Sequence, residues 1–379
     1  MQLTSPKFDD HELQLVKQCL DSCWVTQGPM VAQFEQVFAA RHQARYALAT
    51  TSCTAALHLA TMALGLKPGD EIIVPAFTWV TSAHCAEYVG ARAVFADVEF
   101  DTFNLDPQAL QAAITPRTRA VVVIHLFGLA AKMDEIMALA RQHRLFVIED
   151  AACAVGTAYA GQPVGALGDI GCFSFHPRKI ITTGEGGMVT TQNETWANTI
   201  KSLRNHGATG FLQPAPSLPK PYHMGPFDLL GYNLRLSDIQ AAVGLAQMAK
   251  LDGLLEERRR LAEHYTELLS DVAEITLPGA PEKCGHTYQS YVIRVVQGGM
   301  AKRNQVMECL DALQIQTRPG THAVHRLGYY AHKYELKPGQ FPVAAACEDT
   351  TITLPLFPGM TEAQQQFVAA SLKKALGSV

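Results

Sequence analysis

A single lysine has the surroundings of a reactive amine. Lys179 follows the apolar, strand-like run Ile170 to Phe175 and precedes a turn rich in glycine, Gly184 to Gly187. Apolar and aromatic neighbours would desolvate the amine, and desolvation lowers the pKa of a lysine. A lysine in this state is nucleophilic enough to form a Schiff base. The alternative is a solvated surface lysine, which is the usual situation for this residue type.

A carboxylate supplies the second candidate group. The apolar strand Leu145 to Ile148 ends in Glu149 and Asp150 and then meets small residues. In open α/β sheets, ligands bind at the carboxyl ends of the strands, so an acid in this place can reach a ligand. Asp150 could instead cap a loop. The strand-like run before Lys179 favours the first interpretation, because two strand ends can bring both groups to one crevice.

Small and hydroxylated residues mark a candidate phosphate site. Ser52, Cys53 and Thr54 follow a short strand and precede the helical segment Ala55 to Leu64. Hydroxyl residues cap helix N-termini, and the free N–H groups and the helix dipole attract anions there. A capped helix without a ligand is the alternative that this segment leaves open.

Strand-like and helix-like segments alternate along most of the chain, which predicts an α/β sheet covered by helices. A long charged helix over residues 251–269 follows, and the segments beyond Pro278 predict a small α+β domain. We therefore expect a large domain over residues 1–250 and a small C-terminal domain over residues 251–379. Within the large domain, the proline-rich stretch Gly207 to Pro226 predicts a lid or an interface segment. The expected strands are 45–49, 71–75, 92–98, 119–126, 145–150, 170–175 and 187–191.

Composition excludes several classes of function. The hydrophobic fraction is 48% and the charged fraction 17%, which is ordinary for a globular protein. A net charge of −4 without charged blocks argues against nucleic acid or a membrane as a partner. The nine cysteines lack a regular framework and metal-ligand spacing, so we expect reduced thiols in a cytoplasmic protein and no metal. The sequence shows no signal peptide and no transmembrane run.

Three longer motifs connect these residues to a known family: Gly168 to Gly187, Val147 to Ala152 and Gly231 to Ala242. Essentially the whole chain resembles the DegT/DnrJ/EryC1/StrS sugar aminotransferases, which are pyridoxal-phosphate (PLP) enzymes of fold type I. The resemblance implies the aspartate aminotransferase fold, with a mixed, mostly parallel sheet between helices and a smaller C-terminal α+β domain. It also implies PLP as the cofactor and an amino acid, L-glutamate, that donates its amino group to a keto or aldehydo sugar.

The resemblance assigns roles to the candidate cofactor residues. Lys179 matches the catalytic lysine, and Asp150 matches the carboxylate that keeps the pyridine nitrogen protonated. Cys153 departs from the family pattern, in which Gln or His usually contacts the cofactor, so the effect of its thiol stays open. Asn233 matches a residue that reaches the phosphate of the neighbouring subunit, which makes a homodimer part of the site. The other implied contacts are Trp79 on the ring face, and Ser52, Cys53, Thr54 and Ser174 at the phosphate.

Contacts to the sugar are expected from three places. Arg318, His322 and His325 lie where the small domain of the family closes over the sugar, and they suit an anionic or hydroxyl-rich substrate. Glu185 in the glycine turn could touch the substrate, and Thr26 could line the same mouth. A His-x-x-His pair is also a common accident of sequence, so a structural role for these histidines is the alternative.

Other functions fit less well. A PLP-dependent sugar dehydratase would use the same site, but the family's dehydratases carry histidine where this chain has Lys179. A dinucleotide-dependent oxidoreductase is disfavoured, because no G-x-G-x-x-G motif follows the first strand. A non-catalytic sensor is disfavoured by intact Lys179, Asp150 and Ser174. Among keto sugars, nucleotide-linked ones used for polysaccharide or lipopolysaccharide synthesis are expected, and a free eight-carbon sugar acid or a keto-inositol is the alternative.

Overall fold

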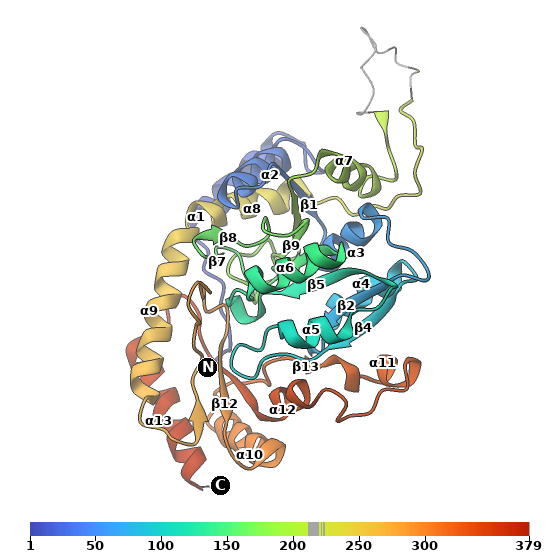
Figure 1. The fold of residues 1–379 in the computed structure, drawn as a ribbon. Coiled ribbons are helices and arrows are strands. Elements are labelled where there is room, and N and C mark those ends of the chain that lie inside the picture. The colour runs from blue at the N-terminus through green and yellow to red at the C-terminus, as the bar shows by residue number, and fades with distance from the viewer. Residues whose placement is uncertain (211–219, 221, 223, 379) are drawn as a thin grey trace.

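The computed structural model describes residues 1–210, 220, 222 and 224–378. Its centre is a seven-stranded sheet with the order β1–β10–β9–β6–β5–β2–β4 (Figure 1). β10 runs antiparallel to both neighbours and the other pairs are parallel, so the sheet is mixed and mostly parallel, as expected. The strands are β1 (Tyr46–Thr50), β2 (Glu71–Pro75), β4 (Arg92–Ala96), β5 (Thr118–Ile124), β6 (Phe146–Asp150), β9 (Ile170–Ser174) and β10 (Gly187–Thr191).

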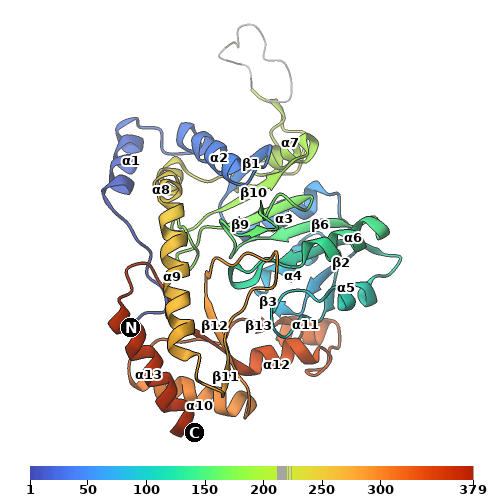
Figure 2. The same cartoon turned by 60° about the vertical axis from the view of Figure 1, so that its left-hand side comes forward.

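Helices cover both faces of this sheet (Figures 1 and 2). Neighbouring residues of one strand point to opposite faces, so that Ile73 and Val121 belong to one core and Ile72 and Val122 to the other. The near-continuous apolar runs of the sequence therefore reflect a sheet buried on both sides. The first core is covered by α2 (Pro29–Arg41), α5 (Pro107–Ala113), α6 (Met133–His143) and α8 (Asp238–Ala249), and the second by α3 (Cys53–Ala63), α4 (Thr81–Tyr88) and α7 (Glu194–Leu203). Outside the first layer, α1 (Asp10–Asp21) packs against α8.

The C-terminal part forms a second, smaller set of strands and helices. α9 (Leu251–Leu269) leads to an antiparallel sheet of β11 (Ile275–Thr276), β12 (Tyr291–Val295) and β14 (Thr351–Leu354). Together with α10 (Gly299–Ala312) and α13 (Glu362–Ser378), these elements enclose a third core. This is the expected α+β arrangement, while the division of the chain at residue 250 stays a prediction.

One segment of the C-terminal part returns to the large sheet. β13 (His322–Ala323) pairs with β3 (Phe77–Thr78), which directly follows β2. α11 (Gly328–Lys333) and α12 (Pro342–Thr350) continue along this side of the molecule (Figure 2). At the other end of the chain, the Leu3 N–H donates to Gln316 at 2.9 Å. The β13–β3 pair thus joins the C-terminal part to the segment that follows β2, and the N-terminus is bonded in turn to the C-terminal part.

Two other expectations concern the proline-rich lid or interface segment and membrane-spanning helices. The middle of the predicted lid or interface segment, residues 211–219 within Gly207 to Pro226, lies outside the described residues. Its role therefore stays a prediction. Within the part of the chain that the structure describes, no helix is both long and apolar enough to cross a membrane.

The two carboxylates at the end of β6 point to opposite faces. Glu149 is fully buried, and its oxygens accept from His125 Nε2 at 3.0 Å and from the N–H groups of Gly165, Leu167 and Gly168 at 2.6–2.8 Å. Burial raises the pKa of Glu149, but these donors outweigh it and hold the pKa below the ordinary value of 4.5. Glu149 is therefore a structural anion that organises the loop before β9.

We expect Glu149→Ala to lower the free energy of unfolding by about 3–5 kcal/mol, since it leaves buried donors unpaired. Urea unfolding at pH 7 measures this, with exposed Glu194→Ala as the control. Because the pKa of Glu149 is lowered on folding, its contribution is complete above 4.5 and is lost as the pH falls through the folded value. The difference between wild type and variant should thus shrink in acid. Equal unfolding midpoints for the two variants at pH 7 would contradict this role.

Candidate active site

A cavity of about 380 Å³ lies at the carboxyl edge of the large sheet. The strand register explains its position, because Thr50, Gly187 and Ser174 are paired across three neighbouring strands at this edge. Asp150 ends the next strand, opposite Cys172. The predicted residues that line the cavity are Ser52, Cys53, Thr54, Trp79, Asp150, Cys153, Ser174, Lys179, Glu185 and Arg318.

Asp150 is a buried carboxylate that the protein itself orients. Ser82 Oγ donates to Oδ2 at 2.6 Å, and the Ala152 N–H donates to Oδ1 at 3.2 Å. The Cys53 sulfur lies 4.0 Å from Oδ1. Burial and then the charge of Asp150 raise the pKa of Cys53 well above its ordinary value, so this thiol keeps its proton. These hydrogen-bond partners are neutral and none of them forms an ion pair with Asp150, so the carboxylate can still pair with a cationic group of a ligand.

Lys179 is half-buried beside a thiol. Its Nζ donates to Cys153 Sγ at 3.1 Å, and its backbone N–H donates to the His176 carbonyl at 2.8 Å. Burial lowers the pKa of Lys179, but Cys153 and then Asp150 raise it further, so the net pKa is raised. The sequence-based prediction of a lowered pKa is therefore wrong here. The neighbouring acidic groups favour the ammonium more strongly than desolvation opposes it.

The α3 helix begins at the cavity wall. Ser52 is its N-cap, with Oγ accepting the Ala55 N–H at 3.1 Å. The first-turn N–H groups and the positive end of the helix dipole make this wall suited to an anion. Gly187 permits the arrangement, because a Cβ on this residue would lie 2.5 Å from the Ser52 carbonyl carbon. The role of these residues at a phosphate stays a prediction that the geometry supports.

Two further lining residues lie at the exposed mouth of the cavity. Trp79 is 51% exposed, and its ring centroid lies 5.6 Å from that of His322. Glu185 is exposed in the glycine turn, and its backbone carbonyl accepts from Gln240 Nε2 at 2.6 Å. Trp79 and Glu185 therefore add an aromatic and an acidic residue to the lining at the mouth of the cavity.

The two histidines of the His-x-x-His pair do not act together. His322 lines an adjoining cavity, where its Nδ1 lies 3.7 Å from Glu348 Oε1. His325 is fully buried, with Nε2 3.0 Å from the Pro338 carbonyl oxygen and its ring against Phe341. Burial lowers the pKa of His325, so the ring is held neutral. The predicted substrate contact of His325 is therefore wrong, because the short helical turn Val324–Arg326 directs this side chain into the interior.

Thr26 and Asn233 lie outside the cavity of their own chain. The Thr26 carbonyl accepts the Asp238 N–H at 3.2 Å, and the Asp238 carboxylate accepts the Gly28 N–H at 2.8 Å. These bonds hold the turn before α2 against the start of α8. Asn233 is exposed and is bridged by its backbone to Asn205. The contacts expected of Thr26 and Asn233 are thus not made within one chain.

Sequence reasoning missed several residues of the site. Ser82 lies in the first turn of α4, where nothing in the local pattern distinguishes it from a solvent-exposed serine. Gln289 lines the cavity from the C-terminal part, and its Nε2 donates to the Arg178 carbonyl at 2.6 Å. Arg178 itself lines the cavity. Because it directly precedes Lys179 in the motif, its position could have identified it as a residue of the site.

The comparisons with known proteins identify the family. The model of the DegT/DnrJ/EryC1/StrS aminotransferase family matches residues 6–373. The chain belongs to this family. It is 39% identical over 376 residues to GDP-perosamine synthase of Caulobacter vibrioides, covering 99% of this chain and 98% of that protein. It is 33% identical to GDP-perosamine synthase of Escherichia coli O157:H7, with coverage of 97% and 96%.

A solved structure supports the same assignment. Spr1654 from Streptococcus pneumoniae, in its PLP form, superposes with a TM-score of 0.93 at 26% identity and covers 100% of this chain and 99% of that one. The predicted family, fold class and cofactor are thereby confirmed. The protein is a PLP-dependent aminotransferase.

The residues of the cavity fit PLP. Lys179 would supply the amine that holds the cofactor, Asp150 would supply an oriented anion for its ring nitrogen, and the start of α3 at Ser52 would supply N–H groups for its phosphate. When bound, PLP supplies an electron sink for the charge that develops on a substrate carbon. Asp150 would hold the proton on the ring nitrogen that this chemistry needs, because its own partners leave its charge uncompensated.

We expect Ser82→Ala to weaken PLP binding roughly tenfold, since one hydrogen bond to the charged Asp150 is lost. Titration of the apoprotein with PLP, followed by tryptophan fluorescence, measures the affinity. Ser270→Ala is the control, because that hydroxyl caps α9 on the exposed surface. Equal affinities of Ser82→Ala and wild type would show that Asp150 does not need this donor.

Proposed function

We propose that the enzyme transfers the amino group of L-glutamate to the carbonyl of a nucleotide-linked keto sugar, for an amino sugar of a cell-surface polysaccharide. The convergence of Lys179 and Asp150 on one cavity carries the proposal of transamination. The relatives support the substrate class, since two of them are named GDP-perosamine synthases. A sugar dehydratase is disfavoured, because the amine of Lys179 is present and faces the cavity.

Different residues of the chain have different roles in this reaction. Lys179 Nζ takes the proton from the α-carbon of the donor and returns a proton in the second half-reaction. Asp150 keeps the ring nitrogen protonated throughout, and the start of α3 anchors the phosphate. Trp79 limits the movement of the ring from one face. In this proposal the protein orients the reactants and transfers the proton, and the cofactor stabilises the charge that develops on the substrate carbon.

We expect Lys179→Ala to abolish transamination of a keto sugar by glutamate, because the residue that moves the proton is lost. The wild-type holoenzyme should be yellow, and borohydride should fix the cofactor to the chain at Lys179, as peptide mass spectrometry can show. Exposed Lys17→Ala is the control and should behave as wild type. A Lys179→Ala protein that still transaminates would overturn the assignment.

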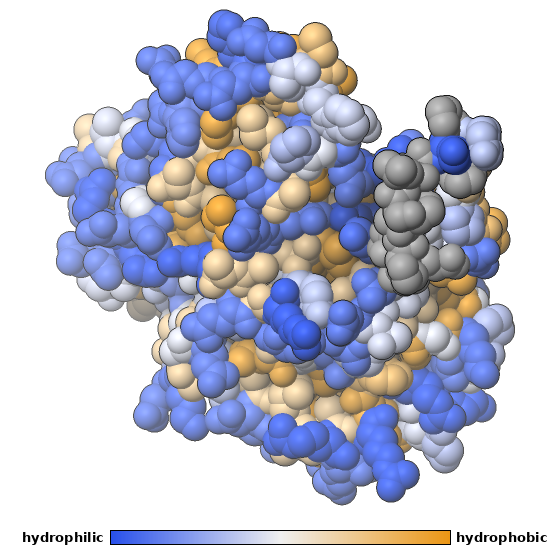
Figure 3. All heavy atoms as spheres, turned by 90° about the horizontal axis from the view of Figure 1, so that it is seen from above, coloured by the Kyte–Doolittle hydropathy of each residue, from blue (hydrophilic) through white to orange (hydrophobic). Residues whose placement is uncertain are grey.

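We also propose that the enzyme acts as a homodimer with shared active sites. Asn233, which the family resemblance places at the partner's phosphate, is exposed and outside the cavity of its own chain. The residues before it form an apolar surface segment, in which Met224 and Leu230 are 88% and 86% exposed. The view from above shows apolar residues among the polar ones on this side of the molecule (Figure 3). Exposed apolar segments of this kind are typical of interfaces.

Leu230→Asp should shift the protein from a dimer to a monomer of 41.3 kDa, since it puts a charge into the proposed interface. Analytical ultracentrifugation measures the mass, and PLP affinity should fall in parallel because the partner's residues are lost from the site. Leu313→Asp, an exposed apolar position after α10, is the control. A dimer that persists in Leu230→Asp with unchanged PLP affinity would contradict the proposed interface.

We propose a cytoplasmic location. All nine cysteines are free thiols in the structure, and two of them, Cys53 and Cys153, line the cavity. Free thiols of this number are typical of proteins in a reducing compartment.

A further inference from the structure

The side chains of Cys153 and Lys179 meet in the cavity, although they come from different segments. Cys153 lies in the loop after β6, and Lys179 lies in the loop between β9 and β10. Lys179 Nζ donates to Cys153 Sγ at 3.1 Å, and both residues line the cavity. Among the described residues this is the one hydrogen bond of the amine, so the sulfur fixes the direction in which the lysine side chain points.

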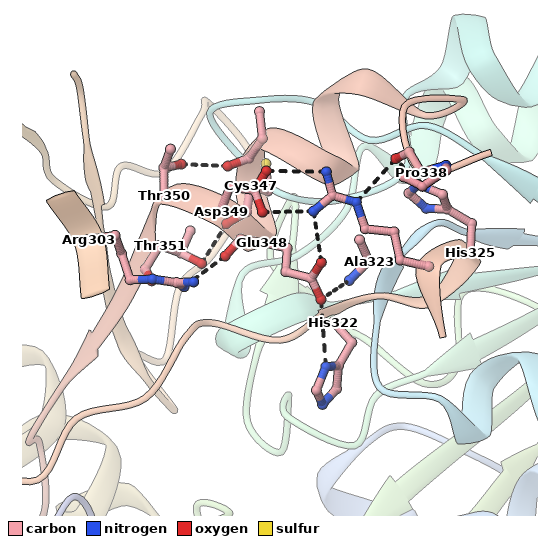
Figure 4. Close-up of polar contacts among 12 residues, drawn as sticks. Arg303, His322, Ala323, His325, Pro338, Cys347, Glu348, Asp349, Thr350 and Thr351 are labelled. Carbon is pink, nitrogen blue, oxygen red and sulfur yellow. Dashed lines mark hydrogen bonds and ion pairs between the residues drawn. The ribbon is translucent and has the colours of Figure 1, made fainter. Parts of the chain in front are cut away.

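No acidic side chain competes with Cys153 for this amine in the part of the chain that the structure describes. Asp150 and Glu185 line the cavity, but neither forms an ion pair with Lys179. The acids that line the adjoining cavity are paired with a cation of their own (Figure 4), in the network of Arg326, Glu348 and Asp349. The amine therefore rests on a sulfur and not on a carboxylate.

The charge of the amine depends on its neighbours. Burial lowers the pKa of Lys179, whereas Cys153 and then Asp150 raise it, so that the pKa is raised overall. Cys153 is thus the neighbour that favours the ammonium most strongly. The other charged or titratable residues that share a lining with Lys179 are Lys7, His176, Arg178, Glu185, Arg258 and Arg318.

The backbone holds both partners independently of this contact. Cys153 lies in a turn that the Ala154 N–H closes on the Ala151 carbonyl at 2.9 Å. On the other side, the Lys179 N–H donates to the His176 carbonyl at 2.8 Å. The flexible part of the pair is therefore the four-carbon stem of the lysine, which carries much rotamer freedom. A partner for the amine is needed to hold this stem in one direction.

We propose that Cys153 is a positioning residue, which receives the amine of Lys179 each time the reaction releases it and keeps it directed into the cavity for proton transfer. This rests on the proposed transamination, in which Lys179 moves the proton. Sulfur is a weak hydrogen-bond acceptor, so it can hold the amine and still release it. A carboxylate in the same place would form a partly buried ion pair, which is costly to separate.

The alternative is that Cys153 contacts only the cofactor, as the family resemblance implies for the residue at this position. Its loss would then change the binding of PLP and leave the reactivity of Lys179 in the apoprotein unchanged. The hydrogen bond favours the positioning role, because it joins two groups of the chain itself.

Reductive methylation of the apoprotein at neutral pH, followed by peptide mass spectrometry, measures the reactivity of the Lys179 amine. Cys153→Ala should be methylated at Lys179 roughly two- to tenfold faster than wild type, because the amine loses one hydrogen bond and the neighbour that most favours its protonation. Cys153→Ser should recover most of this difference, since a hydroxyl can accept the same bond. Cys309→Ala removes a half-buried thiol from α10 and is the control that should match wild type.

In the PLP-loaded enzyme, the positioning role predicts a loss of rate and not of substrate binding. After rapid mixing with glutamate, the cofactor absorbance of Cys153→Ala should change roughly two- to tenfold more slowly than that of wild type. The glutamate concentration that gives half of the maximal rate should stay the same. Cys153→Ser should again lie close to wild type.

Two outcomes would overturn the proposal. One is that Lys179 of Cys153→Ala is methylated at the wild-type rate, and weaker PLP binding beside that result would assign Cys153 to the cofactor alone. The other is faster methylation with no loss in the rate of the absorbance change. Methylation does not depend on transamination. A wild-type enzyme whose cofactor absorbance glutamate leaves unchanged would therefore refute the proposed function, while methylation would still decide whether Cys153 holds the amine.

Discussion

The register of the strands at the carboxyl edge of the large sheet is the constraint on which the site depends. Thr50, Gly187 and Ser174 form one row across three strands, and Asp150 ends the fourth. Side chains alternate between the faces of a sheet, so a slip of one residue in β6 would exchange Asp150 for Glu149. The buried network around Glu149 opposes that slip, because its four donors have no other hydrogen-bond acceptor among the described residues.

The bonding partners of the charged side chains distinguish those that stabilise the fold from those that remain available to a ligand. Glu149 is saturated by His125 and backbone N–H groups, whereas Asp150 is oriented by the neutral donors Ser82 and Ala152. A buried carboxylate without a cationic partner is costly unless a ligand supplies one. In the same way, Arg326 pairs with Glu348 and Asp349, whereas Arg178 has no carboxylate at ion-pair distance among the described residues. Asp150 and Arg178, which have no ion pair among the described residues, both line the active-site cavity.

The C-terminal part completes the site from the other side. Arg318 reaches the cavity because its backbone is bonded to β14 of the small sheet. The pairing of β13 with β3 then places His322 beside Trp79. The carbonyl of Arg178, next to Lys179, accepts a hydrogen bond from Gln289, which precedes β12. The residues that line the cavity thus come from both parts of the chain, and their relative position depends on these crossing contacts.

The sequence by itself determined the order of strands and helices, the mixed α/β class, the family, and Lys179 and Asp150 as a pair. These depend on local properties: apolar runs, helix caps and motifs that stay together along the chain. The expected strand over residues 119–126 is found as β5 (Thr118–Ile124), and the expected helix over residues 133–143 is found as α6 (Met133–His143).

The surroundings of Lys179 and Asp150 could be established only from the tertiary structure. It showed that Ser82 orients Asp150, that acidic neighbours raise the pKa of Lys179, and that His325 turns into the interior. It also showed that Arg178 and Arg318, far apart in sequence, share a junction between cavities. Contacts between distant segments set burial and electrostatic potential, and neither quantity is contained in the local pattern of a chain.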